Sequence, residues 1–169
     1  MVDSRGFGNG FLLPAGPLRE PRRRLGSVDA VVSNQNPDIP GFAMALEGET
    51  LHRMTDARDR RPAGSFRGQK VHAVAGIGDP NRFFLHLTRL GVRVVPHPFP
   101  DHHPLTPEQL DFGEDLPVMM TEKDAVKLRR YGRANWWVLP VTAQLDPAFG
   151  GWLLEKLRGK LHGRRSKAA

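Results

Sequence analysis

Three histidines and one aspartate fall within seven consecutive positions, directly after an apolar run at residues 92–95. They are His97, Asp101, His102 and His103. An aspartate beside a histidine can orient the imidazole ring and stabilise its charged form, which suits general acid–base chemistry or stabilisation of phosphate charge. The same residue types bind metal ions, although a metal site would need a further ligand from elsewhere in the chain. A structural loop held by hydrogen bonds is the third interpretation, and all three stay open.

A second polar group, Thr121, Lys123 and Asp124, follows the apolar run at residues 118–120. A hydroxyl, an ammonium and a carboxylate at the start of a helix could bind a nucleotide base or a phosphate oxygen. The same residues also make an ordinary helix start, with Thr121 as the N-cap and acidic side chains in the first turn. Local rules favour the helix start, and nucleotide binding is the alternative.

A glycine-rich turn at residues 76–81 lies between an apolar run and a helical pattern. It has the form G-x-G-x-x-N, so it lacks the third glycine of the dinucleotide-binding fingerprint, and no acidic residue follows at a strand end about twenty positions on. We interpret it as a tight turn that needs glycine for its backbone conformation. No phosphate-binding loop of the form G-x-x-x-x-G-K followed by Ser or Thr occurs in the chain.

Four arginines, Arg19 and Arg22 to Arg24, form a basic cluster that only Glu20 and Pro21 interrupt. It could bind a phosphate-bearing partner, or it could be a solvated basic loop. The cluster ends a segment at residues 7–24 that is rich in Gly, Pro and Arg and predicts an irregular loop. Such loops often bind ligands.

The elements that must position these groups are predicted from apolar patterns. The expected strands are residues 28–33, 42–46, 71–75, 92–95, 118–120 and 136–141. The expected helices are residues 81–90, with Asp79 as N-cap, a short helix from Thr106, residues 122–130 and a last helix from Asp146. From residue 71 onward strands and helices alternate, which predicts an α/β fold with a three-layer, mostly parallel sheet. Both polar groups follow strands, at the edge where such sheets place their sites.

The composition narrows the function classes. The chain has 169 residues, enough for one domain, and no cysteine, which excludes disulfides, thiolate zinc sites and a cysteine nucleophile. The formal charge is +7, but residues 155–169 carry six basic side chains and one acidic one, so 7 − 5 leaves +2 for the rest. A nucleic-acid partner is therefore not predicted. No apolar run approaches the roughly 20 residues that span a bilayer.

We expect three segments along the chain: a substrate or active-site loop at residues 1–27, an α/β domain at 28–160 and a basic, disordered tail at 161–169. Within the domain, the polar residues 47–69 predict a surface excursion or a hairpin. The chain begins with a polar, glycine-rich segment and no element before it, so it reads like a chain entered midway.

Several long motifs, in this order, closely resemble those of the tetraacyldisaccharide 4'-kinases, the lipid A kinases of Gram-negative bacteria. The motifs are residues 7–10 with 13–21, residues 71–80 with 82–84, residues 99–102 and residues 120–127. The resemblance covers nearly the whole chain but corresponds to about the second half of the family's sequence. It implies a P-loop NTPase-like fold, of which this chain would be the carboxyl-terminal portion.

The resemblance also implies a reaction, in which the γ-phosphate of ATP passes to the 4'-hydroxyl of tetraacyldisaccharide 1-phosphate with Mg²⁺. It implies a cytoplasmic location, peripheral to the inner membrane. By this resemblance His102 is the catalytic residue that helps to activate the hydroxyl, with Asp101 beside it. The further implied contacts are substrate binding by Arg19, Glu20 and Asn9 and nucleotide binding by Thr121, Lys123 and Asp124.

The departure from the family is large. The family's P-loop, its catalytic aspartate, its acidic pair for Mg²⁺ and its membrane-associating helix all lie upstream of the region that this chain resembles. Phosphoryl transfer depends on such groups. We therefore expect the chain alone to bind MgATP poorly and to show no turnover, with the missing amino-terminal half as its partner. The alternatives are a non-catalytic module that binds lipid phosphate and a metal-dependent hydrolase built on His97, Asp101, His102 and His103.

Overall fold

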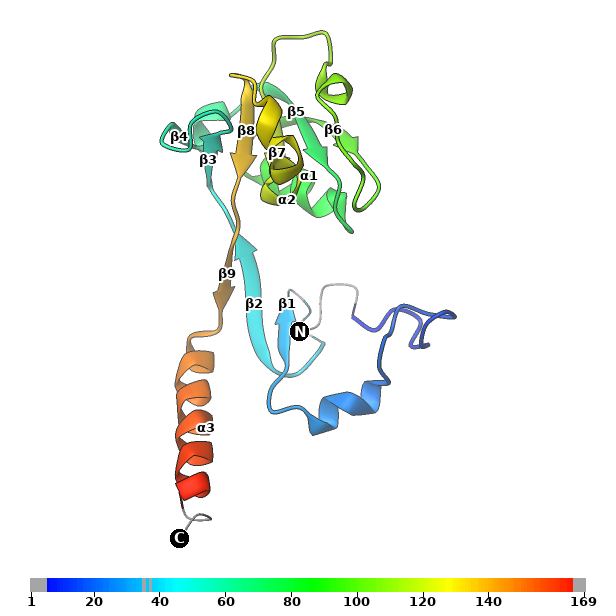
Figure 1. The fold of residues 1–169 in the computed structure, drawn as a ribbon, viewed down its shortest axis with the longest axis vertical. Helices are drawn as coiled ribbons and strands as arrows, with labels where there is room; N and C mark the ends of the chain where they lie inside the picture. Colours follow the sequence, from blue (N-terminus) through cyan, green and yellow to red (C-terminus); the bar gives the residue numbers. More distant parts are fainter. Residues whose placement is uncertain (1–5, 35, 37, 166–169) are drawn as a thin grey trace. The chain divides into compact units, whose positions relative to one another are not determined.

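A computed structural model describes residues 6–34, 36 and 38–165 of the chain, the last five of these by backbone only. The chain forms two compact units, residues 1–47 with 143–169 and residues 48–142 (Figure 1). These boundaries differ from the expected ones, because the first strands pair with a segment near the carboxyl-terminal end and not with the larger sheet. We describe each unit by itself.

The unit at residues 48–142 contains a six-stranded sheet in the order β4-β3-β8-β7-β5-β6. Its strands are β3 (Thr50–Arg53), β4 (Arg60–Pro62), β5 (Lys70–Ala75), β6 (Arg93–Pro98), β7 (Val118–Thr121) and β8 (Trp136–Leu139). Strands β6, β5, β7 and β8 run parallel, whereas β3 pairs antiparallel with both β8 and β4. The mostly parallel sheet confirms the predicted fold class, and the polar segment at 47–69 contains the expected hairpin, β3–β4.

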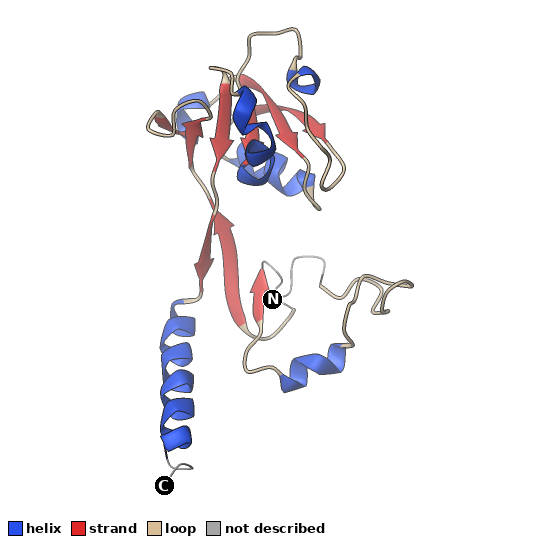
Figure 2. Ribbon diagram, viewed as in Figure 1, coloured by secondary structure: helices blue, strands red, loops and turns tan. Residues whose placement is uncertain are grey.

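Helices cover both faces of this sheet (Figure 2). Helix α1 (Pro80–Arg89) joins β5 to β6, and helix α2 (Glu122–Leu128) joins β7 to β8. Two separate apolar clusters show the three layers. On one face Phe83, Phe84 and Leu87 of α1 pack with Val71, Ala73, Met119 and Trp137, and on the other Ala125 and Leu128 of α2 pack with Val74, Val118, Met120 and Trp136. Because neighbouring strand residues point to opposite faces, each buried strand serves both clusters.

The predicted helix starts are partly right. Thr121 caps α2, since its hydroxyl accepts a hydrogen bond from the Asp124 amide at 3.2 Å. Asp79 precedes Pro80 at the start of α1 but makes no side-chain cap hydrogen bond. The short helix expected from Thr106 is the 3₁₀ turn η3 (Glu108–Leu110), where Gln109 Oε1 accepts from the Thr106 amide at 3.0 Å. Two further 3₁₀ turns are η2 (Ala63–Phe66) and η4 (Arg129–Tyr131).

The other unit contains a small sheet in the order β1-β2-β9, made of β1 (Val32–Asn34), β2 (Phe42–Glu47) and β9 (Thr142–Leu145). The 3₁₀ helix η1 (Arg22–Ser27) precedes the sheet and helix α3 (Pro147–Arg165) follows it. The strand expected at 136–141 is right over β8 (Trp136–Leu139) but does not continue to residue 141. Pro140 has no N–H to donate and lies between β8 and β9, which belong to different sheets. Helix α3 also extends into the tail that was expected to be disordered; residues 166–169 lie outside the described residues.

The two units differ in how much apolar surface they bury. Among the described residues of the smaller-sheet unit, only Ile39 and Met44 are buried hydrophobic side chains, and the rest of the buried core belongs to residues 48–142. Phe42, Phe149 and Trp152 form an aromatic cluster in the former unit, with Phe42 5.1 Å from Phe149 between ring centroids. Within the part of the chain that the structure describes, no helix is long and apolar enough to cross a membrane.

Candidate functional site

Asp101 and His102 lie in the loop that follows β6, at the carboxyl edge of the large sheet. Asp101 Oδ1 accepts a hydrogen bond from the Lys123 ammonium at 2.5 Å, and Asp101 Oδ2 lies 3.6 Å from His102 Nε2. Lys123 is in the first turn of α2, which follows the neighbouring carboxyl end of β7. The structure thus brings both predicted polar groups together, although Asp101 and Lys123 are 22 positions apart.

The backbone of His102 has a φ of 64°, the left-handed region that residues with a side chain rarely adopt. The His102 amide donates to Asp101 Oδ1 at 3.0 Å, which anchors this conformation. The His102 side chain is 81% exposed. Its imidazole therefore lies beside the Asp101 carboxylate and is open to solvent, as a group that exchanges a proton with a bound molecule must be.

The Lys123 ammonium lowers the pKa of the Asp101 carboxyl. Its hydrogen bond to the Asp101 carboxylate is the largest cause of a pKa lowered from the usual 3.8, and the charges of His102 and Lys123 lower that pKa further. Asp101 is thus a carboxylate at neutral pH. The Asp101 carboxylate therefore carries a negative charge 3.6 Å from His102 Nε2.

Asp124, the neighbour of Lys123, is completely buried, and its carboxylate accepts from three donors. These are the Gly76 amide at 3.0 Å, the Thr121 hydroxyl at 2.7 Å and the Lys127 ammonium at 2.8 Å. A buried carboxylate needs such partners to remain charged. The buried Asp124 carboxylate therefore holds the turn after β5 and the start of α2 together, while the Lys123 side chain is partly exposed at the surface.

The glycine-rich turn after β5 lies against the same groups. A side chain at Gly76 would place its Cβ 3.0 Å from Asp124 Oδ1 and 3.4 Å from the Pro100 carbonyl oxygen. A Cβ at Gly78 would lie 3.8 Å from Asp101 Oδ2. The absence of a side chain at Gly76 thus lets the turn approach α2 and the loop after β6 closely, which supports the interpretation of this segment as a close-packed turn.

The predicted substrate residues lie in the other unit. Asn9 holds its own loop together, because its amide nitrogen donates to the Ala15 carbonyl at 2.9 Å and its amide oxygen accepts from the Phe11 amide at 3.1 Å. Glu20 pairs with Arg24 at 3.1 Å on the surface. Arg19 is exposed. The nitrogen and the oxygen of the Asn9 side-chain amide are thus both hydrogen-bonded within the loop, whereas the side chains of Arg19 and Glu20 lie at the surface.

The four residues of the hydrolase hypothesis do not form one site. His97 points away from Asp101 and His102: its Nε2 lies 2.9 Å from Nδ1 of His72, and its ring stacks on Phe112 with centroids 3.9 Å apart. His103 stacks on Phe99 and its Nε2 lies 3.0 Å from the Gln109 amide nitrogen. In the described part of the chain, no three His, Asp or Glu side chains lie close enough together to hold a metal ion. The hydrolase hypothesis is therefore wrong for this structure.

Two partners escaped the sequence analysis. The first is Lys127 of α2, whose ammonium pairs with Asp124 at 2.8 Å. The spacing of three positions on a helix was the available signal. His72 lies inside an apolar strand, and nothing local indicated that it faces His97 across the sheet.

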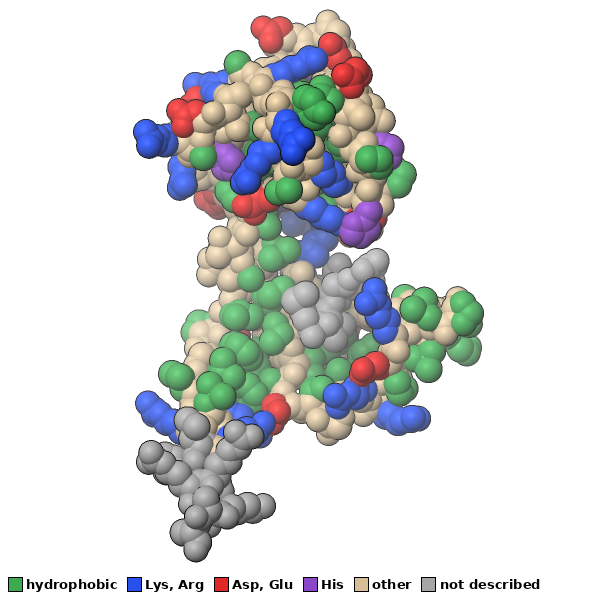
Figure 3. All heavy atoms as spheres, viewed as in Figure 1, with side chains coloured by type: hydrophobic (Ala, Val, Ile, Leu, Met, Phe, Trp, Pro, Cys, Tyr) green, Lys and Arg blue, Asp and Glu red, His purple; other side chains and the backbone are tan. Residues whose placement is uncertain are grey.

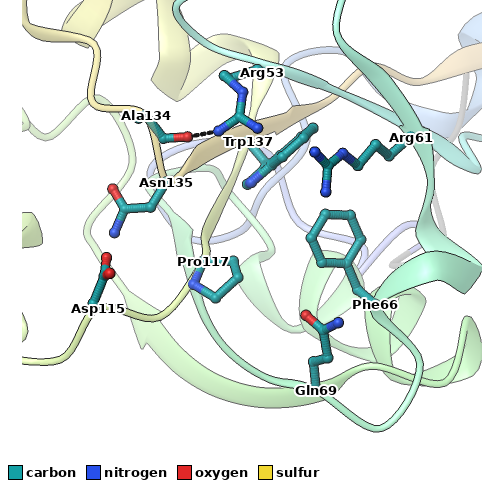
Figure 4. A pocket seen from close by; sticks show the side chains of 9 residues that line it. All are labelled: Arg53, Arg61, Phe66, Gln69, Asp115, Pro117, Ala134, Asn135 and Trp137. Atoms are coloured by element: carbon teal, nitrogen blue, oxygen red, sulfur yellow. Dashed lines mark hydrogen bonds between the residues drawn. The ribbon is translucent and has the colours of Figure 1, made fainter.

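A surface pocket of about 430 Å³ lies at the opposite edge of the large sheet, where β5, β7 and β8 begin (Figure 4). Arg53 and Arg61 both lie over the Trp137 ring, with guanidinium carbons 4.4 and 4.9 Å from its centroid. Both guanidinium groups also pair with Asp59, which neutralises part of their charge. The described residues that line this pocket include none of the candidate site residues, so the pocket is separate from the site at the carboxyl edge.

Comparison with known proteins decides the family. The profile described as LpxK, tetraacyldisaccharide-1-P 4'-kinase, matches residues 1–158. The chain belongs to the tetraacyldisaccharide 4'-kinase family. It is 50% identical over 152 residues to the tetraacyldisaccharide 4'-kinase of Methylobacillus flagellatus, 48% over 173 residues to that of Aromatoleum aromaticum and 49% over 161 residues to that of Pseudomonas aeruginosa.

The match covers nearly all of this chain but only part of each relative. It covers 89%, 97% and 93% of this chain but 45%, 50% and 48% of the respective relatives, so the chain spans about half the length of the curated relatives it matches. A crystal structure of LpxK from Aquifex aeolicus in complex with ATP is also similar, with a TM-score of 0.62 and 28% identity over 92% of this chain and 50% of that one. This neighbour confirms the predicted fold class, the carboxyl-terminal part of a P-loop kinase.

Proposed function

We propose that this chain is the carboxyl-terminal half of a kinase that transfers the γ-phosphate of ATP to the 4'-hydroxyl of tetraacyldisaccharide 1-phosphate in lipid A biosynthesis. Membership of the family and the ATP complex of the similar Aquifex aeolicus protein support the proposal. The observation that carries it is the Asp101–His102 pair. An exposed imidazole, 3.6 Å from a carboxylate whose pKa Lys123 lowers, lies at the edge of the sheet where α/β folds place their chemistry.

In the proposed reaction the oxygen of the 4'-hydroxyl attacks the γ-phosphorus, the bond from that phosphorus to the oxygen bridging to the β-phosphate breaks, and ADP leaves. The hydroxyl gives up its proton during the attack. His102 takes part in accepting this proton, together with an aspartate of the other half of the kinase. Asp101 orients His102 and stabilises the imidazolium that forms.

Lys123 and the arginine-rich loop are the proposed phosphate contacts of this half. The Lys123 ammonium lies at the carboxyl edge beside Asp101, and we infer that it contacts the nucleotide together with Thr121 and Asp124, which hydrogen-bond each other at the start of α2. Arg19 and Glu20 contact the acceptor lipid and its phosphate, and Asn9 gives their loop its shape. A cation beside the transferring phosphate stabilises the charge of the transition state.

The residues of this chain do not fit a Mg²⁺ site by themselves. Asp101 is paired with Lys123, Asp124 is saturated by three donors, and no group of three potential ligands lies together among the described residues. A protein site for Mg²⁺ usually requires one or two free carboxylates beside the substrate phosphates. The Mg²⁺ ligands, the phosphate-binding loop and the catalytic aspartate are therefore assigned to the other half. Because the acceptor is a lipid, the kinase is proposed to act on the cytoplasmic side of the inner membrane, at its surface.

Co-expression tests the proposal. The chain would be produced alone and together with the amino-terminal half of the Pseudomonas aeruginosa relative, and transfer of labelled phosphate from ATP to the acceptor would be measured. The proposal predicts no transfer by either half and transfer by the complex. Turnover by the 169-residue chain alone would contradict it. A complex that binds the acceptor but transfers no phosphate would favour the non-catalytic module instead.

A further inference from the structure

Three consecutive large apolar side chains are exposed at the tip of the loop at residues 7–18. Phe11 is 63% exposed, Leu12 45% and Leu13 61%. Figure 3 shows hydrophobic side chains gathered over this loop, with Lys and Arg side chains beside them. Single exposed apolar residues are common on protein surfaces, but a contiguous apolar tip indicates contact with another apolar phase.

Hydrogen bonds within residues 7–18 give the loop a defined shape. Its backbone hydrogen bonds join Gly10 N to Phe7 O, Leu13 N to Leu18 O, Gly16 N to Leu12 O and Leu18 N to Phe11 O, at 2.8 to 3.2 Å. The Asn9 side chain satisfies two more backbone groups, the Phe11 amide and the Ala15 carbonyl. Because these polar groups at the tip already have partners, the tip can leave water at little cost in unsatisfied hydrogen bonds.

Positive charge adjoins the apolar tip in the sequence. Arg19, Arg22 and Arg23 follow the loop, and all three side chains are exposed. Glu20, the acidic residue of this stretch, is paired with Arg24. The Arg22 guanidinium lies over the Phe7 ring, 4.1 Å from its centroid, so it is held at the base of the loop. Apolar side chains with flanking cations are the pattern that binds anionic lipid surfaces, where the cations meet the phosphates and the apolar groups enter the acyl boundary.

We propose that the 7–18 loop inserts Phe11, Leu12 and Leu13 into the surface of an anionic lipid bilayer, while Arg22 and Arg23 contact the lipid phosphates. The inference rests on the membrane location in the proposed function but not on phosphate transfer. We favour a bilayer over a protein groove as the partner because basic residues adjoin the apolar tip. The partner surface must therefore combine an apolar interior with negative charge at its boundary, as an anionic bilayer does.

Vesicle flotation of the full chain tests the inference. The chain would be mixed with vesicles of phosphatidylethanolamine and phosphatidylglycerol, or of phosphatidylcholine alone, without ATP or acceptor. The loop variant Phe11→Ser, Leu12→Ser, Leu13→Ser would be compared with a matched control, Leu153→Ser, Leu154→Ser, Leu157→Ser. The control removes three apolar side chains of α3 that are 38%, 56% and 49% exposed, close to the basic carboxyl-terminal segment.

The inference predicts that the wild type and the α3 variant float with anionic vesicles, and that the loop variant binds them at least about tenfold more weakly. Binding should also be weaker to phosphatidylcholine vesicles and at high salt. No binding by the wild type, unchanged binding by the loop variant, or equal loss in both variants would overturn the inference. Hydrogen exchange at the Gly16 and Leu18 amides checks that the loop variant keeps its fold.

Site-specific labelling gives an independent readout. The chain has no cysteine, so Leu12→Cys creates a unique position for an environment-sensitive fluorophore. Its emission should shift to the blue with anionic vesicles, whereas the same label at Leu154→Cys should not shift. The opposite pattern would assign the membrane contact to α3 and overturn the inference. Because neither experiment measures turnover, failure here is distinct from failure of the proposed kinase activity.

Discussion

The Gly76 amide donates a 3.0 Å hydrogen bond to Asp124 Oδ2, which joins the turn after β5 to the first turn of α2 across 48 positions of sequence. The next residue toward the amino terminus, Lys123, binds Asp101 in the loop after β6. One turn of α2 therefore holds both neighbouring loops in place. The position of His102 depends on this turn, because Asp101 is the residue that His102 adjoins.

Replacing Asp124 should destabilise the protein strongly. Asp124→Ala would leave the Lys127 ammonium and the Gly76 amide without their buried partner, and we expect a loss of about 3–5 kcal/mol in the free energy of unfolding. Asp124→Asn keeps the shape but loses the charge, so about 1–3 kcal/mol is expected. Urea unfolding followed by tryptophan fluorescence measures both. Glu122→Ala, on an exposed position of the same helix turn, is the control and should change stability by less than about 0.5 kcal/mol.

Removing Lys123 should raise the pKa of Asp101. The Lys123 ammonium is the largest cause of the lowered pKa of this carboxyl, so Lys123→Gln should return that pKa toward 3.8. An NMR titration of the Asp101 carboxyl carbon measures the change. Lys70→Gln, which removes the ion pair with Glu114 instead, serves as control. An Asp101 pKa that responded equally to both variants would contradict the assignment.

Acid should weaken the pairing of His72 and His97. Burial lowers the pKa of both imidazoles below 6.5; Lys70 lowers the pKa of His72 further and Glu114 raises it. Since the folded state then binds fewer protons than the unfolded state, this contribution to stability is complete above pH about 6.5 and is lost as pH falls through the lower folded-state values.

The slope of unfolding free energy with pH tests this. Between pH 7.5 and 5 it should be smaller in the double variant His72→Phe, His97→Leu than in the wild type.

A side chain at Gly16 should disrupt the loop at residues 7–18. An added Cβ would lie within 2.2 Å of Asn9 Oδ1 and 2.4 Å of the Phe11 carbonyl oxygen, where no atom fits. We expect Gly16→Ala to speed hydrogen exchange at the Leu13 and Leu18 amides by at least about tenfold, which corresponds to roughly 1.4 kcal/mol of lost protection. Gly26→Ala meets nothing within 4 Å and should leave exchange in the loop unchanged.

Local patterns in the sequence predicted the parts of the fold that local physics determines. The apolar run at 71–75 and the Thr121 cap needed no distant partner, so β5 and the start of α2 are right. The break at Pro140 was missed because apolar residues continue across it, and only pairing with different strands separates β8 from β9. The pairing of β3 with β8 also depends on residues far apart in the sequence, so the polar pattern at 47–69 could not predict it.

The candidate site divides in the same way. Asp101, His102, Thr121, Lys123 and Asp124 were found because each follows a strand and because the motifs resemble one family. The sequence did not reveal which groups pair with these side chains. Lys123 pairs with Asp101, and Gly76 and Lys127 pair with Asp124. The sequence also did not show that His97 lies apart from Asp101, His102 and His103. Side chains alternate between the two faces of β6, and His97 is on the face where His72 and Phe112 lie.

The measurement that tests the central claim most directly is the turnover of His102→Asn in the complex of this chain with the amino-terminal half of the Pseudomonas aeruginosa relative. If His102 helps to accept the proton of the 4'-hydroxyl, kcat should fall by about 10²-fold or more while KM for ATP stays unchanged. His103→Asn, which changes a histidine paired with Gln109, should retain most of the activity. Wild-type kcat in His102→Asn would contradict the assignment of His102 to the reaction.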